Sequence, residues 1–191
     1  MARMVSFYFL PMKFRDILLQ SKDIYENQPN QVEKIASIFI FTEGAKWMAQ
    51  KMCIIDPETS VSIDKFISFN RYGFLKYTVC LTAFIASFLL FFNINIFLIP
   101  FSILVFYFIE VHFLFLFPLL IDKTPYPIWK SIKTTYKIGL IKAIFIVIRI
   151  AMFMLFGILN SKQPLKNWHI GCLFILIWYQ NEVRNRIRYE F

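Results

Sequence analysis

The feature that most constrains this chain is an apolar run of 26 residues, 96–121, in which Glu110 is the only residue charged at neutral pH. About 20 apolar residues in a helix are enough to cross the hydrocarbon core of a bilayer, which is roughly 30 Å thick. This run would be about 39 Å long as a helix, so it must tilt or kink to fit. Pro100 and Pro118 offer kink sites near its two ends. The run predicts a membrane-spanning helix.

Three further runs have the same character, at residues 74–92, 138–159 and 165–183. The whole chain is 58% hydrophobic with a mean hydropathy of +0.57, whereas soluble domains are about half apolar. The last run has an apolar centre only from Trp168 to Tyr179, which is short for a full crossing. We expect an all-α integral membrane protein with about four transmembrane helices. The alternative is three, with a re-entrant or interfacial helix at the C-terminus.

The N-terminal part of the chain differs from the rest. Residues 1–73 mix charged and apolar positions, and residues 74–191 form the predicted transmembrane domain. Within residues 31–52, apolar side chains recur at helical spacing, which predicts an amphipathic helix on the membrane or on a partner. The short apolar run at residues 4–12 is favoured as an interfacial anchor. An uncleaved organellar targeting segment is the alternative.

Basic residues predict the orientation. The net charge is +9, and the Lys and Arg residues cluster beside the apolar runs rather than forming one basic surface, so the partners we expect are membrane lipids and other membrane subunits, not nucleic acid. With four spans, only Lys162 and Lys166 flank the runs on the outer side. Both termini are therefore predicted on the matrix or cytoplasmic side of a mitochondrial or bacterial inner membrane.

Glu110 needs a partner if it lies at bilayer depth, because a charged group there costs about 2.5 to 3.5 kcal/mol. Arg149, in the third run, is the candidate. Glu110 precedes the end of its run by 11 residues, and Arg149 follows the start of the next by the same number. Both would lie about 16 Å deep on adjacent antiparallel helices. We expect an intramembrane ion pair that fixes helix register; an ion relay or a lipid headgroup site is the alternative.

His112 lies two residues after Glu110, about 200° around a helix, so the two side chains would not share a face. Tyr107 is on the side of Glu110. We expect His112 and Tyr107 to serve in polar packing, with a ligand role as the alternative for His112. The cysteines and histidines lack metal-site spacing, so neither a metal nor a cofactor is predicted.

Two further patterns suggest contacts. Thr78, Thr82 and Ala86 are small residues four apart, a spacing that lets helices approach closely, and they predict a centrally packed first span. A second set of side chains is basic and predicts contact with lipid headgroups or an acidic partner: Lys130, Lys133, Lys137 and Lys142.

The sequence contains no familiar catalytic motif, such as a Gly-rich phosphate loop, GxSxG or HExxH. We therefore expect an accessory, non-catalytic subunit of a larger inner-membrane complex, of the respiratory chain or of another energy-transducing assembly. One alternative is a small lipid-handling enzyme that uses Glu110, His112 and Arg149. The other is a small ion-conducting or proton-conducting protein.

Overall fold

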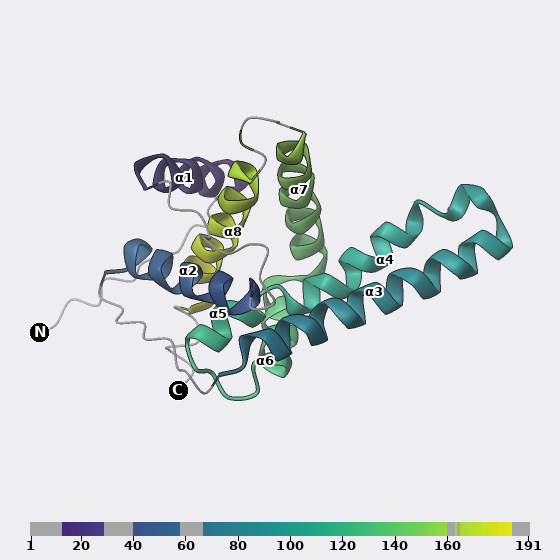
Figure 1. Ribbon diagram of the computed structural model, residues 1–191, viewed down its shortest axis with the longest axis horizontal. Helices are drawn as coiled ribbons and strands as arrows, with labels where there is room; N and C mark the ends of the chain where they lie inside the picture. The colour runs from purple at the N-terminus through teal and green to yellow at the C-terminus, as the bar shows by residue number, and fades with distance from the viewer. Residues whose placement is uncertain (1–12, 29–39, 58–66, 160–162, 164, 185–191) are drawn as a thin grey trace, which may run out of the picture.

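The computed structural model describes residues 13–28, 40–57, 67–159, 163 and 165–184, and all regular secondary structure within them is helical. Figure 1 shows two parts. The hairpin arm, formed by α3 (Phe69–Ile94) and α4 (Phe101–Glu110), projects away from the rest. The body contains the remaining helices: α1 (Phe14–Asn27), α2 (Ile40–Ile55), α5 (Leu116–Ile121), α6 (Pro127–Ile138), α7 (Leu140–Ile158) and α8 (Lys166–Trp178).

Three helical segments in the described residues are long and apolar enough to cross a membrane: Phe69–Ile94, Ile96–Ile121 and Leu140–Gly157. This confirms the prediction of an all-helical protein with several apolar helices of spanning length. The first begins five residues earlier than its predicted start at residue 74, because the helix continues through the polar residues before the apolar run. The second has the predicted bounds.

The hairpin arm is covered by little of the protein itself. Only 11% of the most apolar window of α3 is buried, and at the tip Phe97 is 83% exposed. The turn there is stabilised by Asn95, whose side-chain oxygen accepts a hydrogen bond from the backbone N–H of Phe97 at 2.9 Å. No charged residue occurs between Lys76 and Glu110. A hairpin with such a surface suits a hydrocarbon environment, in which apolar side chains need no protein cover.

The second spanning segment is broken after Glu110. A 3-10 turn, η2 (Val111–Phe113), follows α4, and the chain then turns into α5 in the body. Pro118 has no backbone N–H, so a regular helix could not continue from α4 through this residue with all its hydrogen bonds. It lies instead in the first turn of α5, where proline is tolerated. Two α6 hydroxyls donate to backbone carbonyls at the break, Ser131 to His112 at 2.8 Å and Thr135 to Val111 at 3.1 Å.

The predicted fourth span, residues 165–183, is not among the spanning candidates. Its residues form α8 and a π-helical segment, η3 (Tyr179–Arg184), and most of their side chains are buried inside the body. One neighbour of α8 is α1, a helix with both acidic and basic residues: the rings of Phe14 and Phe174 lie 4.9 Å apart. A helix covered in this way has no continuous face for lipid.

The helix α7 packs closely on α8. A methyl group at Gly157 would collide with Asn167, and one at Gly171 would collide with Met154, so both glycines permit the approach. The opposite face of α7 is exposed and apolar, with Phe145 and Phe156 each 62% exposed. In Figure 1, α7 runs crosswise to the hairpin arm.

The N-terminal helices pack on the C-terminal half instead of standing apart. Trp47 of α2 is 5% exposed, and its ring lies 5.2 Å from that of His169 in α8. The predicted amphipathic helix of residues 31–52 is observed from Ile40 onward, and its residues 31–39 lie outside the described part of the chain, as do residues 4–12.

The predicted packing stripe on the first span is wrong. Thr78, Thr82 and Ala86 are exposed on the hairpin arm, and α3 is a peripheral helix, not a central one. The buried face of α3 includes Gly73 and Cys80 instead. Gly73 is required there because the ring of Phe41 lies where a Cβ would be.

Candidate functional site

The base of the hairpin arm holds an ion pair between its two helices. The ammonium of Lys76 on α3 lies 3.1 Å from a carboxylate oxygen of Glu110 on α4, and the two side chains are 10% and 19% exposed. These are the charges that bracket the uncharged part of the arm. The partner predicted for Glu110, Arg149, was wrong, because the prediction compared depths across the α5–α6 loop and overlooked the nearer cation on the preceding helix.

The position of the pair follows from the length of the arm. Residues 77–94 lie between Lys76 and the tip, and as a helix they are about 27 Å long, close to the roughly 30 Å of the hydrocarbon core. If the arm crosses a bilayer with its tip at the far side, Lys76 and Glu110 therefore lie at the boundary next to the body. The cost of placing charge at the bilayer centre is then avoided.

Arg149 lies elsewhere. It is an exposed residue of α7, and its guanidinium carbon is 5.9 Å from the centre of the Phe14 ring in α1. Cations at such distances from an aromatic face are attracted to it. Arg149 thus joins α7 to α1 within the body, and it does not pair with Glu110.

His112 is a hydrogen-bonded packing residue in the structure. Its Nδ1 lies 2.7 Å from the carbonyl oxygen of Phe108, and its Nε2 lies 3.3 Å from the hydroxyl of Tyr136 on α6. A carbonyl only accepts, so Nδ1–H donates to Phe108, and in the neutral imidazole Nε2 then accepts from the hydroxyl of Tyr136. Tyr107 packs edge to face against Phe106, with ring centres 5.4 Å apart. The contact with Tyr136 joins the end of the hairpin arm to α6.

A second polar cluster, which the sequence did not indicate, lies in the body. Arg184 has a guanidinium nitrogen 2.8 Å from Asp122 and another 3.7 Å from Asp56. The hydroxyl of Tyr179 donates to Asp122 at 2.8 Å. Arg184 and Tyr179 belong to η3, so this cluster joins the C-terminal helix to the ends of α2 and α5. Such buried, multiply bonded charges fix the relative position of elements, since removing one partner leaves the other unpaired.

The predicted basic set is divided between two environments. Lys130, Lys133 and Lys137 occur at helical spacing on α6, and the last two are exposed. Lys142 instead forms an ion pair with Glu182 of η3, with its ammonium 2.9 Å from both carboxylate oxygens. Lys142 therefore contributes to packing within the body.

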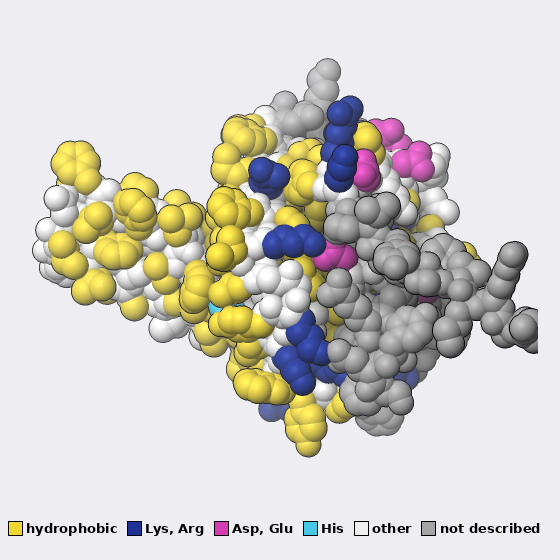
Figure 2. Space-filling model, turned by 180° about the vertical axis from the view of Figure 1, so that it is seen from behind, with side chains coloured by type: hydrophobic (Ala, Val, Ile, Leu, Met, Phe, Trp, Pro, Cys, Tyr) yellow, Lys and Arg dark blue, Asp and Glu magenta, His cyan; other side chains and the backbone are white. Residues whose placement is uncertain are grey.

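Basic side chains gather on the body and at the base of the hairpin arm, and none occurs on the arm between Lys76 and Glu110. Figure 2 shows the arm covered by hydrophobic side chains, with Lys and Arg side chains on the adjoining face of the body. This distribution is the one expected where a protein passes from hydrocarbon to the anionic headgroup layer.

The three residues of the alternative lipid-handling enzyme do not lie together in one site. Glu110 contacts α3, His112 contacts α6, and Arg149 contacts α1. No group of three or more His, Cys, Asp or Glu residues within the described ranges is placed to hold a metal ion. The arrangement offers structural polar contacts at helix junctions.

No protein family model matches this chain, and searches of curated proteins and of solved structures found no similar protein. The class that the fold defines is a protein whose described residues form helices, three of them of membrane-spanning length and composition.

Proposed function

We propose that this chain is an accessory, non-catalytic subunit of a larger inner-membrane complex, anchored by the hairpin arm. The observation that carries the proposal is the contrast between an arm with no charge between Lys76 and Glu110 and a body rich in internal polar contacts. The arm supplies a membrane anchor. The body, on the matrix or cytoplasmic side, supplies surfaces for other subunits.

An ion pair between α1 and the start of α8 supports two crossings. The ammonium of Lys166 lies 3.3 Å from Glu26, so the start of α8 lies next to α1. A four-span topology would place these residues on opposite sides of the membrane. With the hairpin arm as the transmembrane unit, the chain enters and leaves the membrane on one side, where the basic residues of α6 also lie.

The exposed face of α7 supports an assembly role. Its apolar side chains include Ile141, Phe145 and Phe156, which are 72%, 62% and 62% exposed. Because α7 runs crosswise to the arm, an upright arm leaves α7 along the membrane surface and not through it. Exposed apolar patches of this kind mark interaction surfaces. A membrane subunit of the same complex is the partner that we propose, and a respiratory or other energy-transducing assembly is the kind of complex that we expect.

Two double variants and mass spectrometry test the proposal. The full chain is isolated in mild detergent, and the proteins that co-purify are identified. A defined set of membrane subunits is expected, and Phe145→Ala with Phe156→Ala should reduce its recovery at least severalfold, because apolar anchors dominate interfaces. The matched control is Phe92→Ala with Phe97→Ala on the arm, which should retain the partners. Recovery of the chain alone, or equal loss in both variants, would contradict the proposal.

A further inference from the structure

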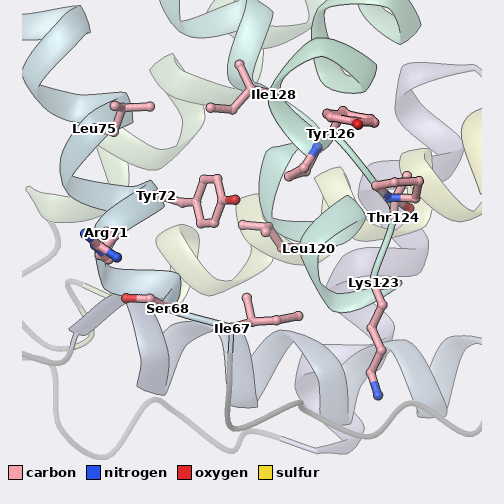
Figure 3. Close-up of a pocket in the computed structure, with 12 residues that line it drawn as sticks. Ile67, Ser68, Arg71, Tyr72, Leu75, Leu120, Lys123, Thr124, Tyr126 and Ile128 are labelled. Atoms are coloured by element: carbon pink, nitrogen blue, oxygen red, sulfur yellow. The ribbon is translucent and has the colours of Figure 1, made fainter.

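A pocket of about 630 Å³ lies where the hairpin arm joins the body. It is formed by the start of α3 and by the loop that joins α5 to α6 (Figure 3). Tyr72 lies between the two sides, and its ring points toward Leu120. The volume is within the range of about 300 to 1,000 Å³ that is typical of small-molecule sites.

The lining combines an apolar interior with basic edges. Ile67, Leu75, Leu120 and Ile128 supply apolar surface, and Arg71 and Lys123 supply positive charge. The two basic residues lie at opposite edges of the pocket in Figure 3. No Asp or Glu occurs among the described residues that line it. The pocket therefore suits a ligand with a negative group and an adjoining apolar part.

The loop on one side of the pocket has a defined backbone. Lys123 has a positive φ of 53°, and its N–H donates to the carbonyl of Leu120 at 3.1 Å. The N–H of Thr124 donates to the carbonyl of Leu119 at 3.0 Å. These two bonds form a Schellman motif, in which the residue at the position of Lys123 is usually glycine. The motif fixes where Lys123 leaves the end of α5.

The depth of the pocket follows from the arm. Arg71 lies five residues before Lys76 along α3. It is therefore about 35 Å from the tip at Ile94, beyond a hydrocarbon core of roughly 30 Å and within the headgroup layer. Two exposed aromatic residues near the pocket, Tyr126 and Trp129, are of the types enriched at this level of a membrane.

We propose that this pocket binds an anionic phospholipid of the leaflet next to the body. Its anionic headgroup lies at the basic edges formed by Arg71 and Lys123, and the start of its acyl chains contacts Leu75 and Ile128. The site is separate from the lysine face of α6, since it uses none of those lysines. It rests on the membrane anchoring by the arm that is proposed above, but it does not require the partner complex of the proposed function.

Lipid binding to the purified full chain tests the site. Phosphatidylglycerol is titrated into the protein in neutral detergent, and bound lipid is counted by native mass spectrometry, with phosphatidylcholine as the uncharged comparison. The wild type should bind phosphatidylglycerol preferentially. Arg71→Gln with Lys123→Gln should weaken that binding about tenfold or more, as expected from the loss of two cations near an anionic lipid. Circular dichroism checks that helix content is unchanged.

The matched control is Lys133→Gln with Lys137→Gln, which removes the same charge from α6. Its affinity for phosphatidylglycerol should stay within about twofold of the wild type, because these lysines lie outside the pocket. Equal weakening in both double variants, or none in either, would overturn the site. Excess inorganic phosphate should not displace the lipid. Displacement would assign the pocket to free phosphate and overturn the lipid assignment. Loss of subunit partners with lipid binding intact would concern only the proposed function.

Discussion

The helices α3 and α8 are both apolar, yet they lie in opposite environments. The best window of α3 is 11% buried, whereas α8 has Leu173, Phe174 and Leu176 at 0% exposure. The difference comes from their neighbours: α4 is the main neighbour of α3, and α8 is surrounded by α1, α2 and α7. Apolar composition shows that a helix must be covered, but it does not show whether lipid or protein covers it.

The largest difference between the two helices is expected in the free energy of unfolding when one leucine of each helix is replaced by alanine. Leu173→Ala in α8 should lower the free energy of unfolding by about 3 kcal/mol, because it removes buried contacts and leaves a cavity. Leu90→Ala in α3, where the residue is 58% exposed, should change it by less than about 0.5 kcal/mol. Thermal unfolding in detergent measures both. Equal effects would show that the arm is packed against protein.

The ion pair at the junction should give the next largest effect. Glu110→Gln leaves Lys76 without its carboxylate, and we expect a loss of about 2 kcal/mol, below the range for fully buried pairs because the pair is partly exposed. The swap Lys76→Glu with Glu110→Lys should restore most of it. Arg149→Gln should have little effect on the arm. If Arg149→Gln matched Glu110→Gln and the swap failed, the assignment of Lys76 as partner would be wrong.

Two glycines separate close packing from open surface. Gly73→Ala should cost about 1 to 3 kcal/mol, because the Cβ would collide with Phe41. Gly44→Ala in α2 should instead stabilise by up to about 1 kcal/mol, since nothing lies within 4 Å of its Cβ position and alanine favours helix. Unfolding by denaturant compares the two. Stabilisation by Gly73→Ala would show that α2 does not contact the base of the arm.

The smallest expected effect is a pH dependence in the body. Burial lowers the pKa of His169, and the charge of Lys51 adds to this, while the bond to Leu165 acts in the opposite direction. The folded chain therefore binds fewer protons there than the unfolded chain. Its contribution is complete above about pH 6.5, the ordinary pKa of histidine, and declines as the pH falls below it. His169→Gln should make the free energy of unfolding depend less on pH between pH 7 and pH 5, by the contribution of about one titrating group. An unchanged profile would contradict a neutral buried His169.

The sequence was sufficient to predict helices, because long apolar runs in this protein form helices of nearly the expected bounds. It also indicated the break in the second span through Pro118, although the break comes before that residue at η2. Lys130, Lys133 and Lys137 recur at helical spacing and lie on α6, a helix that was not predicted between the second and third spans. These are local features, in which the pattern along the chain determines the outcome.

The partners of the charged residues were not predicted. Glu110 pairs with Lys76, and Arg184 contacts both Asp56 and Asp122, which are distant in sequence. Depth matching assumed that every apolar run crosses the membrane. It could not detect that α8 is covered by a charged helix, because such contacts depend on how the N-terminal helices fold back. One signal was available. Lys76 and Glu110 are the first charged residues on either side of an uncharged stretch, so a hairpin that turns in the middle of this stretch brings them together.

Cysteine accessibility tests the central claim, that the hairpin arm alone crosses the membrane. In a background without the native cysteines, single cysteines are placed at the arm tip (Asn95→Cys), on α6 (Lys133→Cys) and between α7 and α8 (Gln163→Cys), and an impermeant thiol reagent is applied from each side. We predict that positions 133 and 163 react from the same side and that position 95 reacts from the opposite side. If position 163 instead reacts from the side of position 95, α7 crosses the membrane and the account is contradicted.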